Sequence, residues 1–412
     1  MMLFNQEEND TLCVKCGKCR SVCPVFDEVR EEGASPRGKT ALVQALSGHM
    51  LAPSRRTKKF LSECLLCTAC TEVCPNGVHT DLLILAAREQ LSACAGQRFT
   101  ETVLTKVVFA NTAASFKLGS AVEAVAGEKL DSGSGVFYRL PADYIVPEIR
   151  GKKFSESKKN TYARRTATGF FLGCLIDFIN HETAEDAIAL LLASGKTPFI
   201  PAQQACCGLP ALSMGDTKTA ARQARAVISL FETADTVVTA CGSCGSMLKH
   251  YYALLFDSPG DREKVRTFAE KVKDITEVID PDVIRPDIAG QAADGTRSVT
   301  YHDPCHLKRG MGVSRGPRQL LEQAGYDLRE MENPDRCCGL GGAFHIKHRE
   351  LSLAITRKKT DDIRSTGAAT VATGCPGCMA NIASMVIREH SRVNVVHTVN
   401  LLAAGLKKQV RG

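Results

Sequence analysis

The chain has 412 residues, of which 44% are hydrophobic and 24% charged, and a formal net charge of +7 at pH 7. This is the composition of an ordinary globular protein of two or three domains. The absence of Trp, the 6% content of aromatic residues and the lack of a nucleic-acid-binding motif argue against a protein that binds nucleic acids.

The chain contains 19 cysteines, and their environment decides what they can do. The N-terminal segment lacks the features of a secretory leader, and no apolar run approaches the roughly 20 residues that span a bilayer. We therefore expect a cytoplasmic protein without a transmembrane segment, located in solution or at the inner face of the cytoplasmic membrane. Its thiols should be reduced and available as metal ligands rather than paired in disulfides.

Residues 1–97 carry the motif C-x2-C-x2-C-x3-C-P twice. This is the ferredoxin signature for two [4Fe–4S] clusters, in which the fourth thiolate of each copy crosses to the other cluster. Zinc, which favours two separated C-x2-C pairs, is the alternative. The motif predicts that one cluster is bound by Cys13, Cys16, Cys19 and Cys74, and the other by Cys64, Cys67, Cys70 and Cys23.

The segment between the two motifs is longer than in a minimal ferredoxin and is expected to be helical. Its hydrophobic periodicity predicts helices at 39–47 and 54–63, and a further helix follows at 81–94. With its two cysteine motifs, this part resembles the helical ferredoxin-like domain of fumarate reductase and heterodisulfide reductase subunits.

Residues 98–165 contain no cysteine. Helical periodicity runs from Arg98 to Ala126, a Gly/Ser turn lies at 131–135, and a stretch rich in Lys and Arg runs from Lys152 to Arg165. We interpret this segment as a helical and basic linker that could contact a partner protein or a membrane surface.

The C-terminal half is an internal repeat, with a first unit at 166–290 and a second at 291–412. Cys174 and Cys305 are 131 positions apart, as are Cys206 and Cys337. Each unit has one Cys, then Cys-Cys-Gly, then C-x2-C, and such a repeat predicts two similar domains related by pseudo-symmetry. Cys94 alone stays outside the four patterns, and we expect it to be a packed core thiol.

Strands and helices alternate in both units. Buried strands are predicted at 168–172, 197–200 and 236–240, and again at 298–301, 327–331 and 370–373. Helices are predicted at 182–194 and 217–233, and again at 315–324 and 349–365. This alternation predicts parallel sheets with right-handed crossovers. The cysteines then fall in turns after strand ends, and several lie at helix N-termini, where the helix dipole favours an anionic cluster. Gly208 and Gly339 are expected to have positive φ or to allow a close approach of the backbone.

These residues resemble the cysteine-rich CCG-domain family. It includes heterodisulfide reductase catalytic subunits, the iron–sulfur subunit of glycolate oxidase, lactate-utilisation iron–sulfur proteins and the third subunit of anaerobic glycerol-3-phosphate dehydrogenase. The resemblance implies an α+β multi-domain fold, with a helical 2[4Fe–4S] ferredoxin-like domain followed by two pseudo-symmetric α/β CCG domains with parallel sheets. In the heterodisulfide reductases five such cysteines hold a noncubane [4Fe–4S] cluster. The sets implied here are Cys174, Cys206, Cys207, Cys241 and Cys244, and Cys305, Cys337, Cys338, Cys375 and Cys378.

Four of the five thiols in a set could also hold a cubane, and zinc is an alternative in one of the two sites. Several histidines lie near the second set: His302, His306, His345 and His348. A proton donor would serve disulfide chemistry, but a hydrogen-bonding or surface role is the simpler interpretation. No catalytic residue is assigned.

No strand–GxGxxG–helix unit is present, so we expect no flavin in this chain. The favoured hypothesis is an electron-transfer subunit of an oxidoreductase. A partner FAD subunit would oxidise D-lactate or glycolate, and electrons would pass through these clusters to a quinone or another carrier. An electron-transferring flavoprotein or a membrane quinone-reducing subunit are further candidate partners. The alternatives are a heterodisulfide-reductase-type subunit that cleaves a disulfide at a noncubane cluster, and a regulatory protein that binds metal only structurally.

Overall fold

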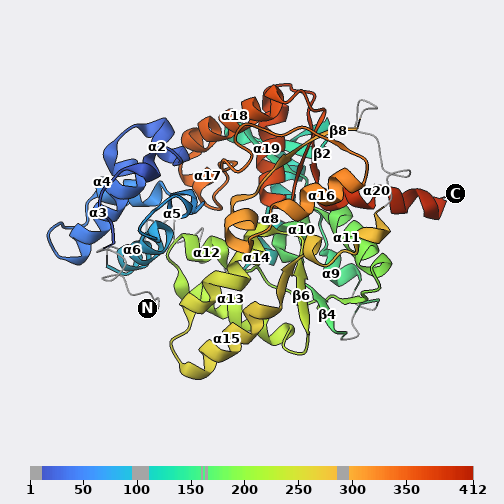
Figure 1. Ribbon diagram of the computed structural model, residues 1–412, viewed down its shortest axis with the longest axis horizontal. Helices are drawn as coiled ribbons and strands as arrows, with labels where there is room; N and C mark the ends of the chain where they lie inside the picture. Colours follow the sequence, from blue (N-terminus) through green and yellow to red (C-terminus); the bar gives the residue numbers. More distant parts are fainter. Residues whose placement is uncertain (1–11, 95–110, 159–160, 163–165, 285–296, 412) are drawn as a thin grey trace.

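The computed structural model describes residues 12–94, 111–158, 161–162, 166–284 and 297–411. Figure 1 shows a helical N-terminal lobe at one end of the molecule and two α/β units that form the larger body. Within the described ranges, no helix combines the length and the apolar character needed to cross a membrane.

The N-terminal lobe consists of short helices joined by the cysteine loops. They are α2 (Pro24–Val29), α3 (Pro36–Ser47), α4 (Arg55–Ser62), α5 (Ala69–Glu72) and α6 (Thr80–Cys94), with 3-10 turns at Lys18–Arg20 and Glu32–Ala34. The Ser35 and Ser54 side chains cap α3 and α4 by accepting backbone N–H bonds. Buried Lys39 donates to the Glu63 carbonyl at 2.9 Å and so ties α3 to the end of α4. The three helices predicted in this part are confirmed.

The segment after the lobe contains a small antiparallel sheet that the sequence analysis did not predict. Helix α8 (Thr112–Ala126) leads into β1 (Glu128–Ser132), β2 (Gly135–Leu140) and β3 (Tyr144–Pro147), which pair in the order β1-β2-β3, and α9 (Phe154–Ser157) follows. The predicted Gly/Ser turn is the β1–β2 connection. We call β1, β2 and β3 the linker sheet. The predicted helical stretch before residue 111 lies outside the described residues.

The first repeat is an all-parallel sheet in the order β5-β4-β6-β7. Its strands are β4 (Thr168–Phe170), β5 (Pro198–Phe199), β6 (Thr236–Thr239) and β7 (Val272–Asp274). Its helices are α10 (Gly173–Phe178), α11 (His181–Ala193), α12 (Leu209–Ser213), α13 (Thr217–Leu230), α14 (Gly242–Ser246) and α15 (Pro259–Lys271), and a π-helix, η5 (Met247–Tyr251), continues α14.

The second repeat has the same topology, in the order β11-β10-β8-β9, again with all pairs parallel. Its strands are β8 (Ser298–His302), β9 (Asp327–Leu328), β10 (Thr370–Thr373) and β11 (Asn394–His397). Its helices are the π-helix η9 (His306–Met311), α16 (Arg315–Gln323), α17 (Phe344–Lys347), α18 (Arg349–Ser365), α19 (Pro376–Arg388) and α20 (Thr398–Arg411). The predicted parallel α/β units are therefore confirmed.

The two repeats pack directly on each other through backbone and glycine contacts. The Gly242 N–H donates to the Gly374 carbonyl at 3.1 Å, and His397 Nε2 donates to the Ala240 carbonyl at 2.9 Å. A Cβ on Gly242 would come within 2.6 Å of Leu307, so α14 and η9 approach each other more closely than larger residues would allow. This contact brings the cysteine loops of the two repeats together.

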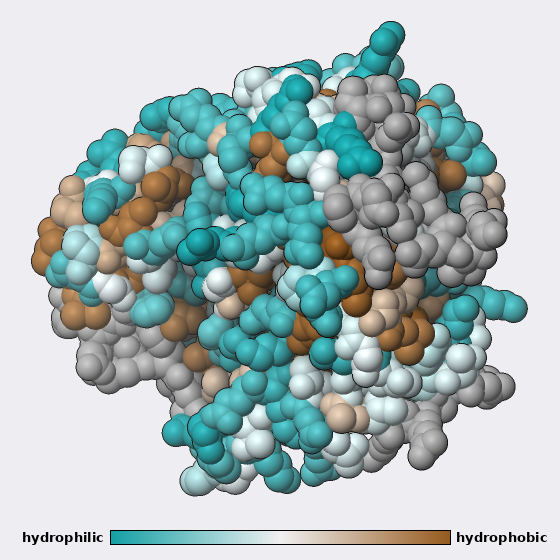
Figure 2. Space-filling model, turned by 45° about the vertical axis from the view of Figure 1, so that its right-hand side comes forward, coloured by the Kyte–Doolittle hydropathy of each residue, from teal (hydrophilic) through white to brown (hydrophobic). Residues whose placement is uncertain are grey.

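The N-terminal lobe docks on the second repeat, with α2 beside α18 (Figure 1). Asp27 on α2 pairs with Lys358 at 2.7 Å and with Arg336, and Glu28 pairs with Lys358 at 2.6 Å. The face drawn in Figure 2 is largely hydrophilic, with its hydrophobic groups in separate patches. The ion pairs of Asp27 and Glu28 hold the lobe against the second repeat.

Candidate iron–sulfur centres

The N-terminal cysteines line two adjacent small cavities. Cys13, Cys16, Cys19 and Cys74 line the first, and Cys23, Cys64 and Cys67 line the second, while Cys70 borders both. We call Cys13, Cys16, Cys19 and Cys74 the outer ferredoxin set, and Cys23, Cys64, Cys67 and Cys70 the inner ferredoxin set. Each motif thus contributes its fourth cysteine to the cavity of the other motif.

Left-handed residues at matching positions shape both cysteine loops. Lys15 and Gly17 in the first loop, and Leu66 and Thr68 in the second, have φ between 54° and 86°. In each loop these are the second and fourth residues after the first cysteine. Left-handed backbone at alternate positions curls the chain, so that successive thiols face one point rather than opposite sides.

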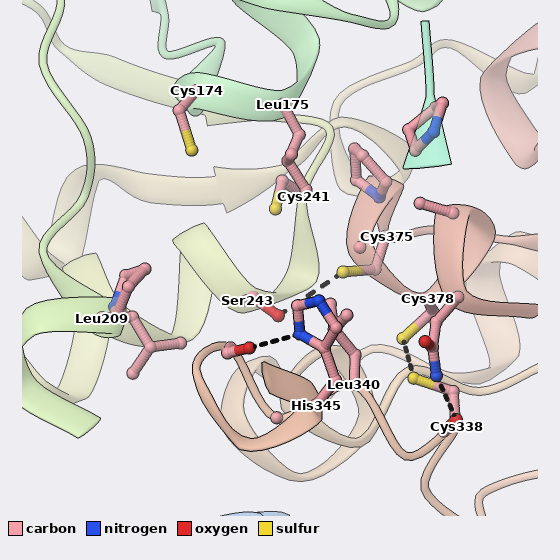
Figure 3. A pocket seen from close by; sticks show the side chains of 18 of the residues that line it. Cys174, Leu175, Leu209, Cys241, Ser243, Cys338, Leu340, His345, Cys375 and Cys378 are labelled. Atoms are coloured by element: carbon pink, nitrogen blue, oxygen red, sulfur yellow. Dashed lines mark hydrogen bonds between the residues drawn. The ribbon is translucent and has the colours of Figure 1, made fainter. Parts of the chain in front are cut away.

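Ten cysteines from the two repeats line one cavity of about 460 Å³. Figure 3 shows part of this lining. The first thiol set is Cys174, Cys206, Cys207, Cys241 and Cys244, and the second thiol set is Cys305, Cys337, Cys338, Cys375 and Cys378. Cys241 and Cys375 are the N-caps of α14 and α19, as expected for thiols placed at helix N-termini. Gly208 and Gly339 have φ of 95° and 90°, which confirms the expectation for the Cys-Cys-Gly turns.

The thiols form a continuous row rather than two separate groups. In the first repeat Cys174 interacts electrostatically with Cys206, Cys207 with Cys244, and Cys244 with Cys241. In the second repeat Cys375 contacts Cys378, the Cys378 and Cys338 sulfurs are 3.2 Å apart, and Cys337 contacts Cys305. Figure 3 shows the Cys338 and Cys378 thiols pointing at each other.

Two further contacts join this row across module boundaries. Cys241 of the first repeat interacts with Cys375 of the second repeat. Cys67 of the inner ferredoxin set interacts with Cys337 of the second repeat. The order in space is therefore the outer ferredoxin set, the inner ferredoxin set, the second thiol set and the first thiol set, which differs from the order in the sequence.

The environment of three thiols of the inner ferredoxin set, Cys23, Cys67 and Cys70, raises their pKa and so favours their neutral form until a metal binds. Burial raises the pKa of Cys23 to about 11. Contact with Cys337, followed by burial, raises the pKa of Cys67 well above the ordinary thiol value, and burial followed by the Cys67 charge does the same for Cys70. Metal ions bind thiolates, so binding here must release protons.

A hydrogen-bond chain links the second thiol set to the other two modules. The Ser243 hydroxyl lies 3.4 Å from Cys375 Sγ and 3.3 Å from His306 Nδ1. His306 Nε2 donates to the Leu66 carbonyl in the N-terminal lobe at 3.1 Å. His306 therefore touches all three modules, which its sequence position beside Cys305 did not reveal.

The other histidines near the second set are all placed by hydrogen bonds. His302 is fully buried, and its Nδ1 lies 3.1 Å from the Pro334 carbonyl. His345 Nδ1 donates to the Gly342 carbonyl at 2.8 Å, and His348 Nε2 contacts the Ser62 hydroxyl at 2.9 Å. The side chain of Cys94 lies outside the described part of the chain, so its packing stays a prediction.

The remaining wall of the cavity is apolar and comes partly from the segment interpreted as a linker. Phe116 and the residues 144–147 and 149 line it together with Leu340 and Ile346. Sequence reasoning missed this role because the segment has no chemically distinctive residue. Asp143 pins the β2–β3 turn by ion pairs with Arg388 and Arg349.

The donor set fits iron–sulfur centres. Every one of the eighteen described cysteines is a free thiol; eight line the two small cavities of the N-terminal lobe, and ten line the shared cavity of the repeats. Thiolate is the ligand of iron–sulfur clusters, and zinc sites use at most four donors.

Comparison with known protein families supports this assignment. A cysteine-rich domain family, CCG, matches residues 168–249 and 299–383, and a 4Fe-4S dicluster domain matches residues 11–78.

Among solved structures, an aspartate racemase homologue from Pyrococcus horikoshii covers 60% of this chain and 100% of its own, at 13% identity and a TM-score of 0.23.

Three relatives are similar in sequence. The probable glycolate oxidase iron-sulfur subunit of Bacillus subtilis is 32% identical over 96% of this chain and 94% of its own length. An uncharacterized iron-sulfur protein of Methanococcus maripaludis is 30% identical over 95% of this chain and 71% of its own. Lactate utilization protein A 1 of Bacillus anthracis is 30% identical over 58% of this chain and 98% of its own. The chain therefore belongs to the CCG-domain iron–sulfur protein family that includes the glycolate oxidase iron-sulfur subunit.

Proposed function

We propose that this chain is the electron-transfer subunit of a flavin-dependent 2-hydroxy-acid dehydrogenase, with D-lactate or glycolate as the substrate of a partner FAD subunit. The continuous row of thiols from the N-terminal lobe to the far repeat is the observation that carries the proposal. The names of the relatives from Bacillus subtilis and Bacillus anthracis give the substrate class.

The outer and inner ferredoxin sets would each hold one [4Fe–4S] cluster, and the two thiol sets would hold one or two further iron–sulfur centres. Bound clusters would supply sites that each gain and lose one electron. The chain itself would fix their order, exclude water from the buried sets and tune each site by hydrogen bonds to sulfur. A noncubane cluster uses five thiolates, and each repeat offers five; zinc remains the alternative occupant of one repeat.

Electrons would enter at the outer ferredoxin set. Cys16 is exposed, whereas the thiols of the second set are buried. A partner flavin can therefore approach the outer set without any rearrangement of this chain. The first thiol set, at the other end of the row, would be the exit toward a quinone or another carrier.

A disulfide-cleaving function is the second candidate. One cavity exposes both thiol sets and carries an apolar wall, which would suit a small organic disulfide placed between two metal centres. In this case the electrons would be consumed inside the cavity instead of leaving the protein.

The test is an anaerobic native purification, with mass spectrometry of co-purifying proteins, followed by addition of D-lactate or glycolate under EPR observation. We expect an FAD protein and cluster reduction within one turnover time of the complex. Cys67→Ala should stop reduction of the second thiol set, and Cys94→Ala, outside the four motifs, is the control. No co-purifying flavoprotein, together with a new signal on oxidation in the presence of a thiol, would favour the disulfide function instead.

A further inference from the structure

The two repeats differ at a buried position three residues before their first cysteine. His302 lies three residues before Cys305, and Phe171 lies three residues before Cys174. His302 is the last residue of β8, and Phe171 directly follows β4, the equivalent strand of the first repeat. Both side chains are fully buried. Where the first repeat has an apolar ring, the second has an imidazole.

The hydrogen bond of His302 fixes which ring nitrogen carries the proton. Nδ1 lies 3.1 Å from the Pro334 carbonyl oxygen, and a carbonyl only accepts. Nδ1 must therefore be the N–H group, and Nε2 carries a free lone pair. Buried Lys359 donates to the Asn333 and Pro334 carbonyls beside the ring.

Nε2 has no hydrogen-bond partner among the described residues although it is buried. A ring nitrogen of His302 and the sulfurs of Cys338 and Cys378 all lie within 4.8 Å of one another. A buried lone pair without a partner is unfavourable, since its hydrogen bond to water is lost on folding and no other bond replaces it. The adjacent thiols point to a metal as the missing partner.

We propose that His302 is a nitrogen ligand of an iron atom in the second centre, bound through Nε2 beside Cys338 and Cys378. This rests on the proposal that the second thiol set holds iron. Metal-binding histidines donate their other N–H to a carbonyl or carboxylate, as His302 does to Pro334. The first repeat, with Phe171 at this place, would hold a centre with sulfur ligands only.

The consequence is a difference between two otherwise similar centres. A neutral imidazole donates less negative charge to iron than a thiolate does, so nitrogen ligation raises the reduction potential of a cluster. The second thiol set, which contacts Cys67, would accept electrons from the inner ferredoxin set more readily than an all-sulfur centre would.

The experiment is pulsed EPR of the full-length protein, purified anaerobically and reduced with dithionite, with natural-abundance and ¹⁵N-histidine samples. We expect a hyperfine coupling from a directly bound nitrogen that changes with the isotope. His302→Phe, which copies the first repeat, should abolish it and keep the ferredoxin signals. His345→Phe is the control, because His345 lines the thiol cavity and its Nδ1 hydrogen-bonds the Gly342 carbonyl.

The inference would be overturned by a wild-type protein that has its full iron content but shows no coupling from a bound nitrogen. A coupling that persists in His302→Phe would also overturn it, and so would zinc in place of iron at this site. The wild-type spectrum decides the question even if the variant does not fold. The readout needs no partner protein, so a missing dehydrogenase partner would count against the proposed function and leave the ligand assignment intact.

Discussion

Cys67 of the N-terminal lobe and Cys337 of the second repeat interact through their side chains, although their modules are separated by the whole first repeat in the sequence. The inner ferredoxin set therefore adjoins the thiols of the C-terminal repeat, while Arg88 and Asp81 of the lobe bond Ser213 and Tyr251 of the first repeat. This arrangement places the second thiol set between the inner ferredoxin set and the first thiol set, and the predictions below test the contacts that maintain it.

The ionic contact between the lobe and the second repeat should control electron transfer between them. Asp27→Asn removes the ion pairs with Lys358 and Arg336, and we expect a loss of about 1 kcal/mol of stability together with slower reduction of the second thiol set. Stopped-flow reduction measures the rate and iron analysis shows that the clusters are intact. Asp361→Asn breaks only an exposed pair with Arg364 and should leave the rate unchanged; equal effects of the two variants would contradict this docking role.

Gly242 should tolerate no side chain. In Gly242→Ala the new Cβ would lie 2.6 Å from Leu307 Cβ and 3.0 Å from its backbone nitrogen, so the repeats must separate. We expect a loss of about 1–3 kcal/mol in the free energy of unfolding and a reduced iron content. Gly260→Ala on α15 is the control because nothing lies within 4 Å of its added Cβ. Thermal unfolding of both variants measures the difference, and identical melting curves would refute the close contact.

The Ser243 hydroxyl should tune the centre that uses Cys375. The single Ser243 hydroxyl proton can be donated to His306 Nδ1 or to the Cys375 sulfur; donated to a cluster sulfur it stabilises the reduced, more negative state, so Ser243→Ala should lower the reduction potential. One hydrogen bond of about 1 kcal/mol corresponds to about 40 mV for one electron. EPR-monitored redox titration measures the shift. Ser384→Ala, which lines the same cavity and bonds only the Asn381 carbonyl, should show none.

Asp274 should make the stability depend on pH. Burial raises its pKa to about 7 in the folded protein, above the ordinary value of 3.8. A raised pKa means that the folded state holds the proton more tightly, so this group stabilises the fold below about pH 4 and loses that contribution as the pH rises to about 7. Urea unfolding of Asp274→Asn should show a flatter pH dependence in this window. Asp216→Asn also removes a helix-capping carboxylate and is the control for the loss of a cap.

Removal of iron should be easier at low pH and reconstitution easier at high pH. The raised pKa values of Cys23, Cys67 and Cys70 mean that the metal-free thiols hold protons that iron must displace. Iron uptake by the anaerobic apoprotein, followed by absorbance between pH 7 and 9, should become tighter as the pH rises. A pH-independent affinity would contradict this account of the thiol environment.

The local structure of the repeats could be predicted closely because the cysteine motifs mark strand ends. The predicted strand 370–373 and helix 349–365 coincide with β10 and α18. The linker sheet could not be predicted, because β1 is mostly exposed and lacks the alternation of buried and exposed residues that identifies a strand.

The grouping of the cysteines by repeat followed from sequence, but their order in space did not. Contacts such as Cys241 with Cys375, and His306 with Leu66, depend on how whole modules pack. No local pattern encodes such packing. The His302 tautomer likewise depends on Pro334, a residue that its own strand does not contain.

The linker sheet has a consequence for how the protein is made. Its turn is held by Arg388, which lies 245 positions after Asp143, and its Ser134 contacts Val395 of β11. A ribosome adds about 5–20 residues per second, so Arg388 is added about 12–50 s after Asp143. During that time the wall is not yet fixed to Arg388, and the second thiol set is complete only once Cys378 has been added. Iron delivery during synthesis would thus find the N-terminal lobe ready first, and the shared cavity would close only as the last helices leave the ribosome.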